Sequence, residues 1–339
     1  MLKGHKIAVI IPCYRVRKHI LRLVSNIPEF VDTIYIVDDK CPEKTGELVK
    51  KSCKDSRVHL ISHKENQGVG QATITGMKEA VKDGAHCLVK IDGDEQHNPE
   101  LIEDFVSPIL NRDADFTKGN RFFYLEDLRQ MPGVRLIGNA CLSFATKFSS
   151  GYWNIFDPTN GYLAVHSLVF QALPHEKIDK RYFFESDLLF RLYTIRAKIV
   201  EIPMHAVYGE EESSLSPSKL ILPFLWRHMI NSLKRIFYSY FLRNFSLASI
   251  YLFLGLFFCL FGGAMGLSAW LQYFGSETGA PIGQVALPGL MILIGVQMIL
   301  GFLNYDLSSI PSSVIHSHLS WLKNKTRGSG RAGLNDTLE

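Results

Sequence analysis

Two aspartates spaced two residues apart could do metal chemistry. Asp92 and Asp94 follow an apolar run at residues 85–91, and Gln96 comes two residues later. Carboxylates with this spacing at the end of a strand can direct oxygen atoms to one point, and an amide oxygen can join them. Such oxygen ligands, together with a diphosphate, are the usual environment of Mg²⁺ or Mn²⁺. The spacing favours a divalent-cation site; the alternative is a polar turn in which Asn98 caps the next helix.

Phosphate binding would have to come from charged groups, because the sequence lacks both common phosphate-binding glycine loops. There is no GxGxxG after the first apolar run and no GxxxxGK[ST] anywhere in the chain. A metal and arginines remain, and a guanidinium group binds phosphate oxygens in a bidentate manner. A solvated surface position is the alternative for any single arginine and is favoured for Arg129.

The elements that must position these residues alternate between strands and helices. Apolar runs predict strands at residues 7–11, 33–37, 58–62 and 85–91, with helices between them at residues 19–27, 44–54 and 70–83. This order predicts a parallel sheet with helices on both faces. Ligands of such sheets bind at the carboxyl ends of the strands. Pro12, Tyr14, Asp39 and Asp92 all fall at strand ends, so that edge is the predicted active site.

Composition narrows the class of protein. The 339 residues carry a formal net charge of +4, with 47% hydrophobic and 21% charged residues. These values exclude a disordered or fibrous chain. They include no dense basic stripe, so we expect no nucleic-acid partner. The six cysteines form no CxxC pair and are expected to be reduced thiols, not a disulfide framework or a zinc site.

Two stretches, residues 244–276 and 278–305, contain no charged residue, and only Glu277 separates them. Each is long enough to cross a bilayer, which takes roughly 20 residues. Buried core helices are the alternative, but two such runs in succession favour two membrane spans. Lys and Arg flank both outer ends, and the connecting loop contains neither. The positive-inside rule then predicts a cell (inner) membrane protein with both termini in the cytoplasm. The N-terminal apolar run stops at Pro12, as a strand does and a signal peptide does not.

These features divide the chain into four predicted parts. They are a cytosolic α/β domain (1–215), an amphipathic juxtamembrane segment (216–243), two transmembrane helices (244–307) and a cytosolic, partly disordered tail (308–339). The juxtamembrane segment is expected to lie in the membrane surface, interrupted near Pro223, with packing on the soluble domain as the alternative. The GxxxG pair Gly262 and Gly266 could pack the two spans closely. His316 and His318 are expected to be interfacial.

Six short segments occur in the order found in family-2 glycosyltransferases with the GT-A fold. They are residues 10–14, 37–39, 66–70, 91–97, 119–121 and 157–162. Over residues 5–310 the chain resembles the polyprenyl-phosphate branch of that family, which includes dolichyl-phosphate mannosyltransferases and bacterial polyprenyl-phosphate glucosyltransferases. The resemblance implies an α/β fold, in which a Rossmann-like, mostly parallel GT-A domain is followed by interfacial helices and a two-helix transmembrane hairpin.

The resemblance also implies how the nucleotide sugar is bound. Pro12, Tyr14 and Asp39 would line the base and ribose, and Asp92 would lie beside the nucleotide and the sugar. The first motif departs from the family at residues 15–16, where Arg-Val replaces the usual Asn-Glu. That departure removes the usual contact of the glutamate and could change the nucleotide preference.

The same resemblance implies a metal and an acceptor site. Asp94 and Gln96 would hold Mg²⁺ or Mn²⁺ on the diphosphate, where the metal neutralises charge on the leaving group. Arg121 and Arg135 resemble the arginines that hold the acceptor phosphate in the lipid-phosphate branch.

Three further acids are implied as catalytic residues. Asp157 would lie near the sugar, and Glu185 and Asp187 fall where many relatives place an acidic pair that acts as base. A hydroxyl acceptor would require one of them to remove its proton. A phosphate acceptor is already ionised at pH 7, and the acids would then orient the sugar or stabilise positive charge on its ring.

The sequence therefore predicts an inverting, metal-dependent glycosyltransferase. It would move one hexose from a UDP- or GDP-hexose to undecaprenyl or dolichyl phosphate at the cytosolic membrane face, with the lipid bilayer as a further partner. One alternative is transfer to a hydroxyl of a glycan or glycolipid. A second is a non-catalytic lipid-binding or export partner, which the intact Asp92, Asp94, Gln96 and Asp157 argue against. A homo-oligomer is compatible with the sequence.

Overall fold

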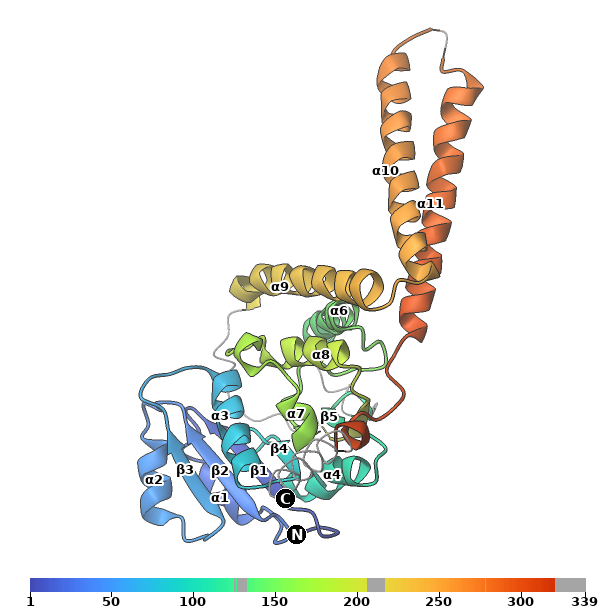
Figure 1. Cartoon of the computed structure of the whole chain (residues 1–339). Coiled ribbons are helices and arrows are strands. Elements are labelled where there is room, and N and C mark those ends of the chain that lie inside the picture. The colour runs from blue at the N-terminus through green and yellow to red at the C-terminus, as the bar shows by residue number, and fades with distance from the viewer. Residues whose placement is uncertain (125, 127–132, 206–216, 278, 321–339) are drawn as a thin grey trace, which may run out of the picture. The chain divides into compact units, whose positions relative to one another are not determined.

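The computed structural model of the protein describes residues 1–124, 126, 133–205, 217–277 and 279–320, with backbone alone at residues 134, 135 and 217–221. The chain divides into two compact units (Figure 1). The first is Met1–Asn231 together with the segment that begins at Pro311, and the second is Ser232–Ile310.

The first unit contains a mostly parallel seven-stranded sheet, with strand order β3-β2-β1-β4-β6-β5-β7 (Figure 1). The strands are β1 (Ile7–Cys13), β2 (Thr33–Asp38), β3 (Val58–Ser62), β4 (Cys87–Lys90), β5 (Phe116–Asn120), β6 (Leu163–His166) and β7 (Ile199–Pro203). β6 runs antiparallel to β4 and β5, and the other pairs are parallel. The four strands predicted from apolar runs are confirmed as β1 to β4.

Helices connect these strands. They are α1 (Ile20–Ser25), α2 (Thr45–Ser52), α3 (Val69–Lys82), α4 (Ile102–Leu110), α6 (Gly133–Ser150), α7 (Ser167–Gln171) and α8 (Phe184–Thr194), with single 3₁₀ turns at η1 (Pro99–Leu101) and η2 (His175–Lys177). Asn98 caps η1 through its side chain, which accepts a hydrogen bond from the backbone N–H of Glu100, as predicted.

The central strand explains why the sequence shows continuous apolar runs. Ile7, Val9 and Ile11 of β1 join one buried cluster with residues of α1 and α4. Ile10 faces α3 on the opposite side, where a Cβ added to Gly76 would lie 2.6 Å from its Cγ2 atom. Because helices cover both faces, every position of the strand is buried, and no alternation with polar residues is required.

The second unit contains two long apolar helices, α10 (Leu247–Tyr273) and α11 (Ile282–Ser308). Each is long and apolar enough to cross a membrane, with mean hydropathies of 2.1 and 2.2. In these windows 11% and 17% of the residues are buried, whereas the core helices of a soluble protein would be mostly buried. Gly262 lies where the helices approach closely, since a Cβ there would be 3.0 Å from Met291 Cβ. Gly295 is tighter, at 2.6 Å from Cys259 Sγ.

The helix α9 (Pro217–Phe237) precedes a π-helical turn, η3 (Tyr238–Arg243), and continues from the first unit into the second. The predicted interruption near Pro223 is wrong, because Pro223 lies inside a continuous helix. A proline in the second turn of a helix lacks the N–H that would bond to a carbonyl of the first turn. It therefore removes one of the first backbone hydrogen bonds of the helix and none from its middle. All six cysteines are free thiols, as expected.

The segment that follows α11 returns to the first unit and is fastened there by Asp115. This buried carboxylate accepts hydrogen bonds from the backbone N–H groups of Ile315 and His316, both at 2.9 Å, and pairs with His316 Nδ1 at 2.8 Å. The His316 ring also stacks on His166, with ring centroids 4.3 Å apart. The expectation that His316 is interfacial is therefore wrong, because its side chain is buried against Asp115, which lies 201 residues away in the sequence. The part of the tail predicted to be disordered lies outside the described residues.

Candidate active site

The predicted nucleotide residues lie at the carboxyl ends of β1 and β2, where Cys13 pairs with Asp38 in register. Pro12 is buried in β1, and Tyr14 follows it as an exposed ring. The Arg15 guanidinium lies 5.5 Å from the centre of the Tyr14 ring, so the residue that departs from the family motif contacts the predicted base-binding side chain.

Asp39 organises the loop that leads into α3. Its Oδ1 atom accepts a hydrogen bond from Gln67 N at 2.9 Å and pairs with His63 Nδ1 at 2.7 Å. Its Oδ2 atom accepts from Gly68 N at 2.8 Å. Gly68 has a φ of 96°, a conformation that favours glycine. The carboxylate is buried, and the loop of residues 66–70 wraps around it.

Asp92 is held by a buried lysine that the sequence analysis missed. Lys90, the last residue of β4, is fully buried. Its Nζ atom donates to Asp92 Oδ1 at 2.7 Å, to the Gly161 carbonyl at 3.1 Å and to Glu185 Oε1 at 3.2 Å. Burial opposes the charged form, but the two carboxylates outweigh it and raise the pKa of Lys90 above its ordinary value. Lys90 therefore joins the predicted nucleotide acid to the predicted acid on α8.

Asp94 and Gln96, the predicted metal residues, share one turn. Asp94 Oδ1 accepts a hydrogen bond from Gln96 N at 3.1 Å. Glu95 between them has a φ of 61°, and its carboxylate pairs with Arg22 and with His19 beside α1. This contact fastens the turn to α1.

His97 takes a structural position in the same loop. Its Nδ1 atom accepts a hydrogen bond from Asp92 N at 3.2 Å, and its ring stacks on Tyr162. Burial lowers the pKa of His97 to about 4, which keeps the imidazole neutral and able to accept. The Nδ1 atom of His97 is therefore already engaged by the backbone N–H of Asp92.

The donor set fits a hard divalent cation. The Asp94 carboxylate and the Gln96 amide offer oxygen atoms, which Mg²⁺ and Mn²⁺ prefer. In the described part of the chain, no three His, Cys, Asp or Glu side chains gather into a metal-holding group. Such a site suits a cation whose remaining ligands come from a diphosphate and water, as is usual for Mg²⁺.

Arg121 and Asp157 form a bidentate ion pair. Arg121 Nε lies 2.8 Å from Asp157 Oδ2, and Arg121 Nη2 lies 3.0 Å from Oδ1. The Asp157 side chain is 0% exposed and that of Arg121 is 26% exposed. Burial would raise the pKa of Asp157, but the hydrogen bonds and charge of Arg121 hold it below its ordinary value. Two residues predicted for separate roles, at the sugar and at the acceptor phosphate, therefore lie in direct contact.

Two further residues support this pair, the half-buried Glu201 and the buried Lys118, and the sequence analysis missed both. Glu201 of β7 accepts hydrogen bonds from the backbone N–H of Phe156 at 2.6 Å and of Asp157 at 3.1 Å. Its second oxygen accepts from Asn120 Nδ2 at 2.9 Å. Lys118 of β5 donates to the Asn160 carbonyl at 2.6 Å, and burial lowers its pKa to about 8. The available signal was a charged residue inside each of these short strands.

The site has two halves, the group of Lys90, Asp92 and Glu185 and the pair of Arg121 and Asp157. The segment of residues 157–162 connects them. Its Gly161 carbonyl accepts from Lys90, and Asn160 Nδ2 donates to Asp157 Oδ2 at 3.4 Å. A Cβ at Gly161 would lie 1.8 Å from Asp92 Oδ2, so only glycine fits against the first aspartate. The structure thus brings together Asp92, Asp157, Glu185 and Arg121.

Two predicted residues do not join this group. Asp187 lies on α8 but pairs with Asp179, Arg191 and Asn231 instead of with the residues around Asp92. Arg135 belongs to α6, and its side chain lies outside the described residues.

The chain is similar to known proteins in sequence and in structure. A model of the family described as Glycosyl transferase family 2 matches residues 8–173. The UDP-N-acetylglucosamine–dolichyl-phosphate N-acetylglucosaminyltransferase of Methanococcus voltae is 32% identical over 218 residues, which cover 60% of this chain and 86% of the relative. The polyprenol monophosphomannose synthase of Mycolicibacterium smegmatis is 28% identical over 213 residues, which cover 61% of this chain and 79% of that protein.

A solved structure shares the fold. Glucosyl-3-phosphoglycerate synthase from Mycobacterium tuberculosis, in complex with Mn²⁺, UDP and glucosyl-3-phosphoglycerate, matches with a TM-score of 0.53 at 17% identity. The match covers 68% of this chain and 80% of that one. The expected GT-A fold is thereby confirmed.

Proposed function

Because the chain belongs to glycosyltransferase family 2, we propose that this enzyme moves one hexose from a nucleoside-diphosphate sugar to a polyprenyl phosphate. The transfer would occur at the cytosolic membrane face with inversion at the anomeric carbon. The observation that carries the proposal is the partly exposed Arg121 guanidinium, held by Asp157 within the same group of residues as Asp92. The acceptors named for the Methanococcus voltae and Mycolicibacterium smegmatis relatives support a polyprenyl phosphate.

The donor would bind along the ends of β1, β2 and β4. Pro12, Tyr14 and Asp39 would line the nucleotide, and Asp92 would lie beside the sugar. Asp94 and Gln96 would hold Mg²⁺ or Mn²⁺, which when bound neutralises charge on the leaving nucleoside diphosphate. The Mn²⁺ and UDP named for the Mycobacterium tuberculosis synthase support this combination of ligands.

The acceptor would bind at the arginines. Arg121 suits this role because its guanidinium is always charged, is 26% exposed and carries five N–H donors, of which the Nε and Nη2 edge binds Asp157. We expect Arg135 to assist it. The bound phosphate oxygen attacks the anomeric carbon from the side opposite the leaving diphosphate, at about 3–3.5 Å. A phosphate acceptor is already ionised, so Asp157 and Glu185 would stabilise positive charge on the sugar ring and need not remove a proton.

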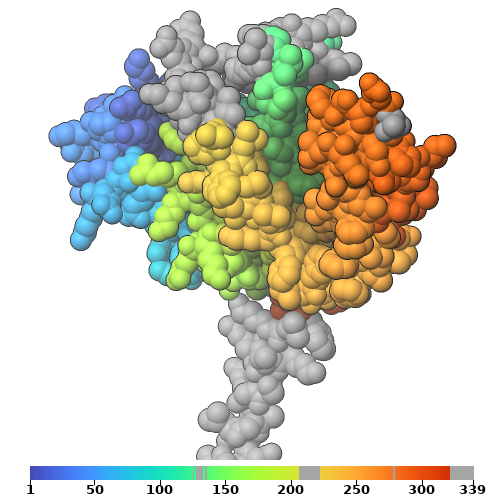
Figure 2. All heavy atoms as spheres, turned by 90° about the horizontal axis from the view of Figure 1, so that it is seen from above, coloured from blue at the N-terminus to red at the C-terminus, as the bar shows by residue number. Residues whose placement is uncertain are grey.

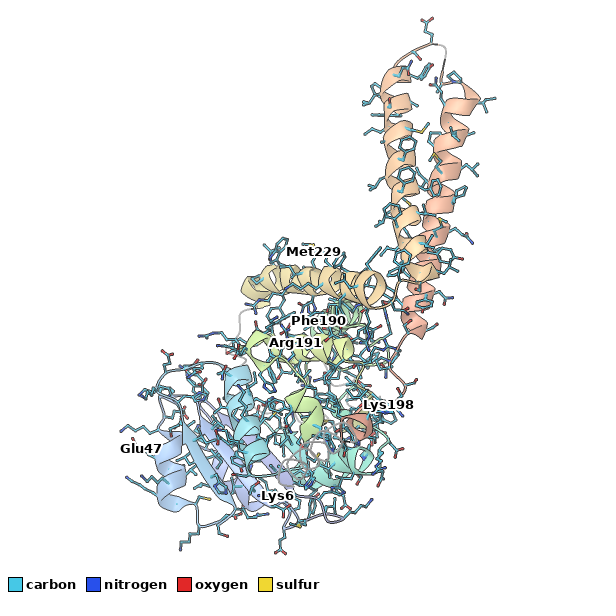
Figure 3. The ribbon with its side chains drawn as sticks, viewed as in Figure 1. Lys6, Glu47, Phe190, Arg191, Lys198 and Met229 are labelled. Atoms are coloured by element: carbon cyan, nitrogen blue, oxygen red, sulfur yellow. The ribbon has the colours of Figure 1, made fainter. Side chains whose placement is uncertain are left out.

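The surface of α9 supports a position in the membrane surface. Two of its polar residues are buried against the rest of the first unit, where His228 pairs with Ser149 and Asn231 with Asp187. Its apolar residues are exposed, including Trp226 at 60%, and this face is coloured yellow in Figure 2. Met229 points away from α8 (Figure 3). A helix whose polar face is used internally and whose apolar face is bare fits the boundary of a bilayer.

The test is a transfer assay with the full-length protein in detergent. It would use Mg²⁺ or Mn²⁺, a panel of labelled UDP- and GDP-sugars, and undecaprenyl or dolichyl phosphate, with label in the organic phase as the readout. We expect metal-dependent transfer from one donor, lost in Asp94→Ala. Label that enters glycan or glycolipid hydroxyls but never polyprenyl phosphate would overturn the proposal in favour of a hydroxyl acceptor.

A further inference from the structure

A buried carboxylate on α8 joins the part of α9 up to Asn231 to the rest of the first unit. Asp187 Oδ1 accepts a hydrogen bond from Asn231 Nδ2 of α9 at 3.0 Å. Its Oδ2 atom accepts from the backbone N–H of Asp179 at 3.0 Å and from Arg191 Nε at 2.8 Å. Arg191 is labelled on α8 in Figure 3. The three donors come from three parts of the chain, and Asp187 therefore fixes them relative to one another.

The segment before α8 provides a second contact with α9. The carboxylate of Asp179 pairs with Arg227 of α9 and also accepts from the backbone N–H of Arg181 at 2.9 Å. Arg191 donates to the carbonyl of Lys177 as well. α9 thus holds the segment of residues 177–181 directly through Asp179 and indirectly through Asp187.

This segment packs on the loop around Asp39. The Lys180 carbonyl accepts a hydrogen bond from Gln71 N at 3.1 Å. A Cβ at Gly70 would lie 2.5 Å from the Asp179 carbonyl oxygen, and a Cβ at Gly68 would lie 2.4 Å from that of Lys180. Gly68 in turn donates to Asp39. A shift of the segment must therefore move the loop that holds the Asp39 carboxylate.

A second connection runs along α8 itself. Glu185 precedes Asp187 by two residues in the first turn of the helix and accepts a hydrogen bond from Lys90. Lys90 also holds Asp92. The placement of the first turn of α8 therefore determines where Glu185 meets Lys90, and with it the position of Asp92.

We propose that Asp187 is a positioning residue, which couples the seating of α9 to the geometry of the donor site through Asn231, Asp179 and Glu185. The inference rests on the proposed function, since that function identifies the loop of Asp39 and the residues around Asp92 as the donor site. A carboxylate that already accepts from three donors holds the helix in place and does not remove a proton from an acceptor.

The test compares Asp187→Asn and Asn231→Leu by two readouts, nucleotide binding and steady-state transfer. Binding of UDP and GDP with Mn²⁺ is measured by calorimetry on full-length protein. Each variant loses a hydrogen bond to a buried charge, so we expect about tenfold weaker nucleotide binding and an equal rise in the donor KM. We expect kcat to stay within about threefold and the pH profile of kcat to be unchanged, because no proton-transfer group is removed.

His228→Phe is the matched control. His228 is also a buried residue of α9; its Nδ1 atom pairs with Ser149 Oγ on α6 at 2.8 Å, and its ring packs against Phe183, the N-cap residue of α8. Phenylalanine removes the hydrogen bond to Ser149 and keeps an aromatic ring against Phe183. We expect this variant to have a lower melting temperature and nucleotide binding within about twofold of wild type, as expected for a lost hydrogen bond away from the site.

Two results would overturn the proposal. A fall in kcat of about 10²-fold or more in Asp187→Asn, with the acidic limb of the pH profile lost and Asn231→Leu normal, would make Asp187 a base. Wild-type nucleotide binding in both variants would reduce the contact to a contribution to stability. The binding readout needs no lipid, so wild-type protein that binds nucleotide but never labels polyprenyl phosphate would disprove the proposed acceptor and still test the role of Asp187.

Discussion

Neighbouring charges help to decide the direction in which the pKa of each acid in the site is shifted. Burial raises the pKa of Glu201 and the charge of Asp157 adds to this, which outweighs the hydrogen bonds that Glu201 accepts from two backbone N–H groups and an amide. At Asp157 the Arg121 guanidinium outweighs burial and lowers the pKa. Lys118, which donates to a carbonyl, has its pKa lowered to about 8. The pKa of an acid in this site is therefore lowered where a cation contacts it.

At the residue scale, Gly161→Ala tests the contact between the two halves of the site. The added Cβ would lie 1.8 Å from Asp92 Oδ2 and 2.8 Å from Lys90 Nζ, so both groups must move. We expect kcat/KM for transfer to fall by about 10²-fold or more, since misplacement by about 1 Å has that effect. The measurement is steady-state transfer with the donor that the wild type selects.

Gly138→Ala in α6 is the control for that substitution, because a Cβ there would meet no atom within 4 Å. We expect it to transfer sugar at the wild-type rate. Activity of Gly161→Ala near that of the control would show that Asp92 and Gly161 need not pack together in the active enzyme.

Sequence reasoning identified the residues whose types are distinctive and missed those that resemble ordinary strand residues. Asp92 and Asp94 stand out because they follow the apolar run at residues 85–91, and Arg121 stands out as the last residue of the Gly-Asn-Arg segment that resembles the family. Lys90 lies inside the predicted strand of residues 85–91, where a lysine interrupts an apolar pattern without indicating any partner. Its contact with Glu185, 95 residues away, exists only after the chain has folded.

At the element scale, the strands that sequence reasoning predicted are those with a long apolar run. β1 and β2 are continuous apolar runs and were identified. β5 and β7 were not, because Lys118 and Glu201 break their apolar pattern. In these two strands, the charged side chains that support the site also concealed the strands that carry them.

The segment after α11 illustrates a contact that no local pattern could indicate. Burial opposes ionisation of Asp115, but hydrogen bonds from His316, Ile315 and Lys198 outweigh it and lower its pKa below the ordinary 3.8. Lys198 directly precedes β7, so the Asp115 carboxylate links β7 to the segment that follows α11. Polar groups that are buried together in this way stabilise the folded state only while all of them are satisfied.

Asp115→Asn tests this contact. We expect it to lower the stability of the first unit by about 3 kcal/mol at pH 7, because a buried charge loses its paired donors. The melting temperature should fall by roughly 6–12 °C. Thermal unfolding monitored by circular dichroism would measure the change, with the exposed Asp113→Asn as the control.

The pH dependence of that difference has a definite sign. The folded pKa of Asp115 lies below 3.8, so the unfolded state binds the proton more readily. The stabilisation is fully present above about pH 3.8 and is lost as the pH falls through the folded pKa. Wild type and Asp115→Asn should therefore converge in strong acid. A difference that stayed constant down to that range would contradict the assigned role of the carboxylate.

At the scale of the whole molecule, the proposed donor site and the two long apolar helices belong to different units of one chain. The α/β domain and the apolar hairpin could both be predicted, because long-range patterns of hydrophobicity survive in the sequence. The domain boundaries could not be fixed as sharply: the segment that begins at Pro311, predicted to be a separate tail, is grouped with the first unit.

The mass of the lipid product tests the central claim most directly. Full-length protein would be incubated with the selected nucleotide sugar, a divalent cation and a polyprenyl phosphate of defined length, and the extracted lipid measured by high-resolution mass spectrometry. The account predicts the acceptor plus one sugar residue with a single phosphorus atom, and none of this product with Asp94→Ala. A lipid that gains a second phosphorus atom, or a sugar found only on a hydroxyl acceptor, would contradict glycosyl transfer to the lipid phosphate.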